Sequence, residues 1–131
     1  DQPKRPAAVK KWMAPPPEWC DICTVALVAK SPGLGPGGAE ALALAEEIKA
    51  GLILLDGRAA RTEALRRGLL VSGLIGVLLD AAEHGLINLQ DALDRLVRTS
   101  FYIEPGLITE ILAWDAERQK LSPKQRGQLP P

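Results

Sequence analysis

Two carboxylates, Glu40 and Asp56, are the residues of this sequence that most suggest a functional site. We expect Glu40 on the first turn of a helix, and Asp56 directly follows a short apolar run that predicts a strand. In open α/β sheets, ligands bind at the edge where strands end and the following helices begin. Two carboxylates at that edge would supply the hard oxygen ligands that Mg²⁺ or Mn²⁺ prefers. The helix dipole and ordinary turn formation explain the same two residues without any metal.

The segments around this pair alternate between predicted strands and predicted helices. The strands are predicted over 19–28, 52–55 and 69–71, and the helices over 39–50, 58–67 and 73–84. This order predicts parallel strands joined by right-handed crossovers, with helices on both faces of the sheet. The run 52–55 is wholly apolar, so we expect it to be covered on both faces. Ala41, Leu44, Ala45 and Ile48 predict the buried face of the helix over 39–50.

Further elements are predicted on either side of this alternating region. They are helices over 7–14, 89–97 and 105–117 and an edge strand over 101–103. Glycines at 51, 68 and 85 are placed to end helices, because glycine readily takes the left-handed conformation found there. We expect the helix over 73–84 to be buried, because it is apolar nearly all round. Residues 1–119 are predicted to form one domain, and 120–131 a disordered polar tail.

The composition narrows the classes of protein that fit. The 131 residues include 16 Lys and Arg and 16 Asp and Glu, so the formal net charge is zero and no global field attracts nucleic acid. The longest apolar stretch falls short of the ~20 residues that a membrane helix needs, and no secretory signal is evident. Two cysteines do not make a disulfide framework, so we expect a soluble cytoplasmic protein without a membrane partner. The chain starts at Asp1 and not at Met, which suggests a fragment or a processed product.

Other candidate sites in the sequence have simpler explanations. Cys20 and Cys23 have the spacing of a thioredoxin motif, but they lie in a predicted strand and not at a helix start. No second pair of Cys or His completes a zinc site. The glycines over 33–38 lack the Gly-Lys-Ser/Thr of a phosphate loop. His84, the only histidine, lies at the predicted C-terminal end of a helix, where a histidine interacts favourably with the helix dipole.

Several segments, taken in order, resemble the PIN-domain family. They are Gly38–Ala45, Leu54–Asp56, Arg58 with Ala60–Arg61, Gly73 with Gly76–Leu79, and Gly85–Ile87. The resemblance runs from about Pro6 to Arg118 and is closest to predicted nucleic-acid-binding proteins akin to VapC-type toxins. It implies a three-layer α/β/α fold around a short parallel sheet. It also implies a metal-dependent ribonuclease, often the toxin of a toxin–antitoxin pair.

The resemblance assigns roles to particular residues. Glu40 matches the middle acid of the family and Asp56 the acid after the next strand, which makes both catalytic ligands of Mg²⁺ or Mn²⁺. Arg58 and Arg61 lie nearby and would hold a phosphate of the RNA. The family's first strand, with its acid, is missing from this chain, and Gly57 stands where a further acid is common. We therefore expect an incomplete or impaired nuclease.

Two alternatives remain open at this point. The first is a non-catalytic interaction domain derived from a PIN fold, which would form a homodimer or bind an antitoxin through the helices over 73–97. The second is a generic doubly wound regulatory domain.

Overall fold

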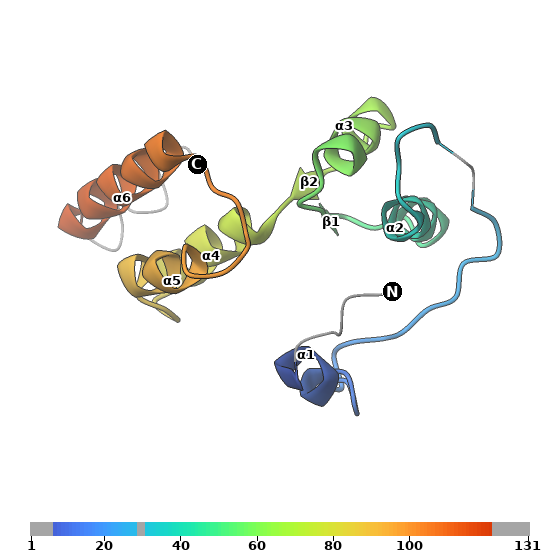
Figure 1. The fold of residues 1–131 in the computed structure, drawn as a ribbon, viewed down its shortest axis with the longest axis horizontal. Coiled ribbons are helices and arrows are strands. Elements are labelled where there is room, and N and C mark those ends of the chain that lie inside the picture. The colour runs from blue at the N-terminus through green and yellow to red at the C-terminus, as the bar shows by residue number, and fades with distance from the viewer. Residues whose placement is uncertain (1–6, 29–30, 122–131) are drawn as a thin grey trace. The chain divides into compact units, whose positions relative to one another are not determined.

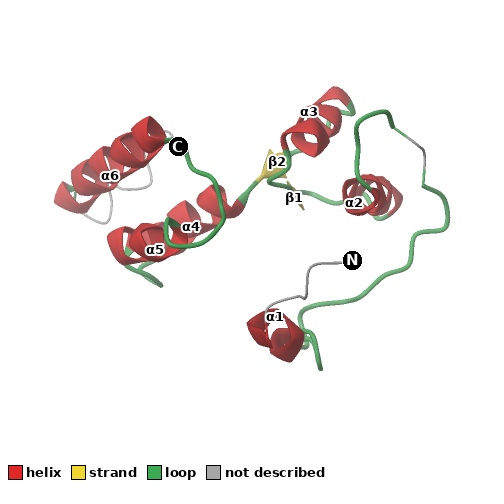
Figure 2. Cartoon of the chain, in the orientation of Figure 1, coloured by secondary structure: helices red, strands yellow, loops and turns green. Residues whose placement is uncertain are grey.

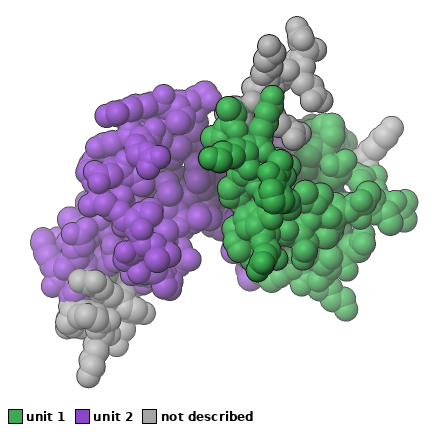
Figure 3. All heavy atoms as spheres, turned by 90° about the horizontal axis from the view of Figure 1, so that it is seen from below, with its two compact units in different colours: residues 1–51 green, residues 52–131 purple. Residues whose placement is uncertain are grey.

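The computed structural model describes residues 7–28 and 31–121, which form helices and one short sheet (Figure 1). The chain divides into two compact units, residues 1–51 and residues 52–131 (Figure 3). The single domain predicted over 1–119 stays a prediction. Most of the predicted tail, residues 122–131, lies outside the described residues.

The first unit contains two helices, α1 (Ala7–Trp12) and α2 (Pro36–Glu47). Helix α1 ends shortly before three consecutive prolines, which lack the amide donor that a helix interior requires. Helix α2 begins at Pro36, earlier than predicted, because proline suits the first helical position. Its buried residues are Leu42 and Ala45, whereas Ile48 is 60% exposed. The predicted buried face of this helix was therefore right at Ala45 and wrong at Ile48.

The end of α2 is closed by a lysine and not by the predicted Gly51. Lys49 has a φ of 53°, in the left-handed region. The Lys49 amide donates to the Glu46 carbonyl, and the Ala50 amide donates to the Ala45 carbonyl. These two bonds satisfy carbonyls that the last helical turn leaves without partners, and they offset the strain at Lys49.

Two other predicted helix ends are confirmed. Gly68 and Gly85 have φ values of 75° and 71°, directly after the helices that they were expected to close. In both places the residue after the glycine donates back to a carbonyl in the last helical turn, Leu69 to Ala64 and Leu86 to Ala81. Glycine adopts this conformation without the steric penalty that other residues meet.

The second unit opens with a strand–helix–strand motif, β1 (Ile53–Leu54), α3 (Arg58–Arg66) and β2 (Val71–Ser72), which α4 (Leu74–Glu83) follows directly. The two strands, drawn in yellow in Figure 2, form one sheet. They are parallel, with Ile53 opposite Val71 and Leu54 opposite Ser72. The parallel pairing is confirmed, and β1 lies within the strand predicted over 52–55, whereas β2 overlaps the strand predicted over 69–71 only at Val71. The two-sided burial was wrong, because Ile53 is 8% exposed and Leu54 is 57% exposed.

The rest of the second unit is helical, with α5 (Leu89–Leu96) and α6 (Pro105–Lys120) packed beside α4. The core consists of Ala82, Leu89, Leu93 and Ile111. Helix α4 is not buried all round as predicted, because Ala82 is its one buried residue and Val77 is 41% exposed. Among the described helices, none is both long and apolar enough to cross a bilayer.

Helix α6 continues its buried face with charged residues. Asp115 and Arg118 are each 5% exposed, and the Arg118 Nη2 lies 2.5 Å from the Asp115 Oδ1. Gln119 donates to the other Asp115 oxygen at 2.7 Å, and the Arg118 guanidinium lies 5.6 Å from the centre of the Trp114 ring. Buried charges are tolerated when they are paired and hydrogen-bonded in this way.

Two predicted strands are absent from the described residues. Residues 19–28 carry β-branched side chains but no strand pairing, and the Cys20 amide donates to the Pro17 carbonyl in a turn. Residues 101–103 follow a turn in which the Phe101 amide donates to the Thr99 hydroxyl. Strand propensity reflects packing against neighbouring strands, so it does not make a strand where no partner is present.

Glu63 on α3 holds two arginines on the next turn. Its carboxylate accepts hydrogen bonds from Arg66 at 2.7 and 2.8 Å and from the Arg67 Nε at 2.8 Å. These two hydrogen-bonded arginines lower the pKa of Glu63 from 4.5 to about 2. Helix α3 therefore carries an ion-pair cluster that stabilises the folded chain while Glu63 is ionised.

We predict that Glu63→Gln lowers the free energy of unfolding at neutral pH, and that this effect disappears as the solution is acidified. A lowered folded-state pKa contributes stability above the unfolded value, 4.5, and this contribution is lost as the pH falls through about 2. Thermal unfolding of both proteins between pH 7 and pH 2 should show a lower Tm for the variant near pH 7, with a gap that closes toward pH 2. A gap that stays constant across this range would contradict the prediction.

Candidate functional site

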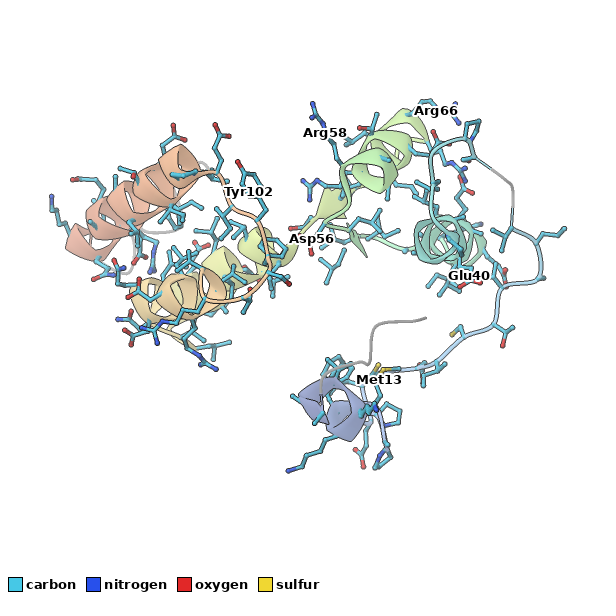
Figure 4. All side chains as sticks on the ribbon, in the orientation of Figure 1. Met13, Glu40, Asp56, Arg58, Arg66 and Tyr102 are labelled. Carbon is cyan, nitrogen blue, oxygen red and sulfur yellow. The ribbon has the colours of Figure 1, made fainter. Side chains whose placement is uncertain are left out.

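Asp56 lies just beyond β1 (Figure 4) and is linked to the start of α4 by a hydrogen bond. Its Oδ1 accepts a hydrogen bond of 2.9 Å from the backbone amide of Leu74, the first residue of α4. The N-cap residue of α4 is Gly73, which has no side chain to do this. Asp56 therefore satisfies one of the amides that a helix start leaves unpaired, from a position far away in the sequence.

Arg61 approaches the same place from α3. Its Nη1 donates to the Leu55 carbonyl at 2.9 Å, and the residue is half-buried. The bond ties the first turns of α3 to the end of β1. A guanidinium has five donors in all, so the bond to Leu55 does not exhaust its capacity to bind a phosphate. Arg58, the first residue of α3, is exposed at the same end of the helix (Figure 4).

Gly73 makes room for this arrangement. A Cβ at Gly73 would lie 2.6 Å from the Asp56 Oδ1, 2.8 Å from the Arg61 Nη1 and 3.2 Å from the Leu55 carbonyl oxygen. The φ of Gly73 is −137°, so the position requires glycine for space and not for its backbone conformation. Three polar groups thus converge on one glycine, at the end of a parallel strand.

Glu40 belongs to the first unit. Because α2 begins at Pro36, Glu40 lies beyond the first turn where we predicted it, and it is exposed. It lines a hollow of about 350 Å³ that includes Cys23 and Leu44. Cys20 and Cys23 are free thiols. Glu40 and Asp56 lie in separate units, so their use as ligands of one ion stays a prediction.

The residues present have oxygen donors that suit a divalent cation. The Leu74 amide uses Oδ1 of Asp56, which leaves Oδ2 for a metal, and the side chain is exposed. Among the described residues, no group of three or more Asp, Glu, His or Cys side chains is placed to hold a metal ion. Asp56 with its neighbouring amide and arginine therefore forms the candidate site.

The roles of Gly73 and Leu74 in this site were not predicted from the sequence. Gly73 was noted only for its place in the family pattern, and no role in the site was assigned to Leu74. A glycine between a strand and a helix, after an earlier Asp at a strand end, is the one sequence signal that points to them. It does not reveal the hydrogen bond, because the two residues are 18 positions apart.

This architecture is a small α/β fold, with an acid at the end of a parallel strand. A family model described as PIN domain matches residues 7–117, so the chain belongs to the PIN-domain family, as its sequence pattern indicated. The family is generally nuclease-like, and its members typically use divalent metals and bind nucleic acids or partner proteins. Searches of the curated proteins and of the solved structures found no match to the chain.

We predict that Gly73→Ala destabilises the second unit by about 1–3 kcal/mol, because its Cβ would displace the Asp56 carboxylate and the Arg61 guanidinium. Gly106→Ala is the matched control. Gly106 lies in α6, nothing is within 4 Å of its Cβ position, and alanine there should stabilise by about 0.4–1 kcal/mol. Urea unfolding of both variants measures the difference. Equal effects of the two substitutions would contradict the crowding at Gly73.

Proposed function

We propose that this chain is a metal-dependent ribonuclease domain with impaired activity, of the kind found as the toxin of a toxin–antitoxin pair. The observation that supports this most is Asp56, an exposed carboxylate fixed at the end of a parallel strand in a chain of a nuclease-like family. The hydrogen bond from Leu74 fixes the orientation of the carboxylate. That orientation gives Asp56 Oδ2 one direction in which to bind Mg²⁺ or Mn²⁺.

The remaining residues supply binding and orientation. Glu40 is the second carboxylate ligand in this proposal. When bound, the metal would activate water and offset negative charge on the scissile phosphate. Arg61, held by the Leu55 carbonyl, would place a phosphate beside Asp56, and Arg58 would reach the adjacent phosphate. The start of α4 adds further backbone amides, which favour anions at a helix N-terminus.

We expect activity to be low. Two carboxylates hold Mg²⁺ weakly, because this ion demands an ordered octahedron of oxygen ligands. Gly57 adds no carboxylate beside Asp56. This favours one alternative, a non-catalytic interaction domain that pairs with itself or with an antitoxin.

The test is cleavage of single-stranded RNA by the purified chain in the presence of Mn²⁺. Loss of one ligand should reduce the rate at least about tenfold, so Glu40→Gln and Asp56→Asn should both fall by that factor or more. Glu47→Gln is the matched control, because Glu47 is an exposed carboxylate on the same helix as Glu40. Cleavage that persists unchanged in both ligand variants would refute the metal assignment, and no cleavage by the parent chain would favour the interaction domain.

Asp56 allows its structural and chemical roles to be separated. Asparagine keeps a carbonyl oxygen that can accept from the Leu74 amide, whereas alanine removes it. We predict that Asp56→Ala lowers the free energy of unfolding by about 1 kcal/mol, as loss of a helix cap does, and that Asp56→Asn costs less. Both should lose Mn²⁺-dependent cleavage alike. Equal stability of the two variants would show that the hydrogen bond contributes little to the fold.

A further inference from the structure

A second feature of the 52–131 unit has no part in the nuclease proposal. A hollow of about 650 Å³ opens between α4 and α6, with one wall also formed by β2. Its apolar lining comes from Leu79 on α4 and from Leu107, Ile111 and Trp114 on α6. Leu107 is 41% exposed. None of the proposed nuclease residues lines it.

The charged lining of this hollow has one sign. Asp80 and Glu83 extend it along α4, Glu110 faces it from α6, and no Lys or Arg is among its lining residues. All three acids are exposed. His84 directly follows α4, and its Nδ1 lies 3.6 Å from the Asp80 Oδ1, where it forms an ion pair only when the imidazole is protonated. The hollow thus combines an apolar floor with an anionic border.

The sign of this charge determines which occupant fits. Three carboxylates repel the phosphates of RNA and of a lipid surface, whereas they attract arginine and lysine. A groove between two helices can accept an amphipathic helix, which inserts its apolar side chains into the groove and keeps its charged face outward. Apolar residues along one helical stripe would meet the leucines and Trp114, and basic residues beside that stripe would meet the acids.

We propose that this α4–α6 groove docks a basic amphipathic helical segment of a partner protein. The charge complementarity supplies orientation and speed of association, and the apolar floor supplies most of the affinity. The proposal is independent of nuclease activity, because it uses a different set of side chains.

A synthetic helical peptide tests the proposal directly. The probe has leucines on one face and arginines on its flanks, and the matched peptide carries glutamates in place of the arginines. The protein is the full chain with Trp12→Phe and Trp19→Phe, which leaves Trp114 as its one tryptophan. We expect the arginine peptide to bind with a change in Trp114 emission, and the glutamate peptide not to bind.

Substitutions then locate the binding. The triple variant Asp80→Asn, Glu83→Gln and Glu110→Gln should bind about tenfold more weakly, the sum of several exposed ion pairs. The matched control, Glu47→Gln with Asp94→Asn and Glu117→Gln, removes three exposed acids outside the groove and should leave binding unchanged. Leu107→Asp should abolish binding, whereas Leu86→Asp, at a leucine that is 76% exposed outside the groove, should not. Circular dichroism checks that each variant is folded.

Four results would overturn the proposal. They are equal weakening by the two triple variants, binding without a change in Trp114 emission, a change in Trp114 emission on addition of an RNA oligonucleotide alone, and self-association of the chain that Leu107→Asp abolishes. The first two place the peptide elsewhere on the surface. The last two give the groove to a nucleic acid or to a second copy. Loss of RNA cleavage in the Asp56 variants, with peptide binding unchanged, would leave the docking proposal intact.

Discussion

The hydrogen bond from the Leu74 amide to Asp56 is the interaction on which the candidate site depends. It joins the end of β1 to the start of α4, and so connects the strand–helix–strand motif to the helical part of the same unit. Gly73 permits the approach, and the bond from Arg61 to the Leu55 carbonyl fixes α3 against it. Strands of two residues have few ladder bonds of their own, and these two side-chain bonds add to the hydrogen bonds that hold the motif together.

The same carboxylate that caps a helix is also the proposed metal ligand. A carboxylate has two oxygens, so one can accept a backbone amide while the other binds a cation. In this proposal the capping bond would act as an outer-sphere support that limits rotation of the ligand. The groove between α4 and α6 lies in the same unit and is lined by acids. It would attract a basic partner, whereas Arg58 and Arg61 of the candidate site would attract the phosphates of RNA.

Local sequence signals predicted part of the fold correctly. The position of β1 and the glycines after α3 and α4 were predicted correctly, because an apolar run and a left-handed glycine are local signals that depend on a few neighbouring residues. Strand β2 was predicted two residues too early. The strands over 19–28 and 101–103 were wrong, because β-branched side chains favour a strand only where another strand pairs with it. The predicted end of α2 at Gly51 was also wrong. Two backbone hydrogen bonds hold Lys49 in a left-handed conformation that its residue type disfavours, so the residue type did not reveal where the helix ends.

By itself, the sequence determined the PIN-domain family, the parallel strand–helix–strand order and the place of Asp56 after a strand, because these follow from residue order and hydrophobic spacing. Only the tertiary structure decided what Asp56 contacts. The Leu74 amide, the Arg61 guanidinium and the gap above Gly73 come from segments separated along the chain, and no local pattern encodes their approach. Packing also decided that α4 is exposed on one side, since burial depends on which neighbours cover an apolar face and not on that face alone.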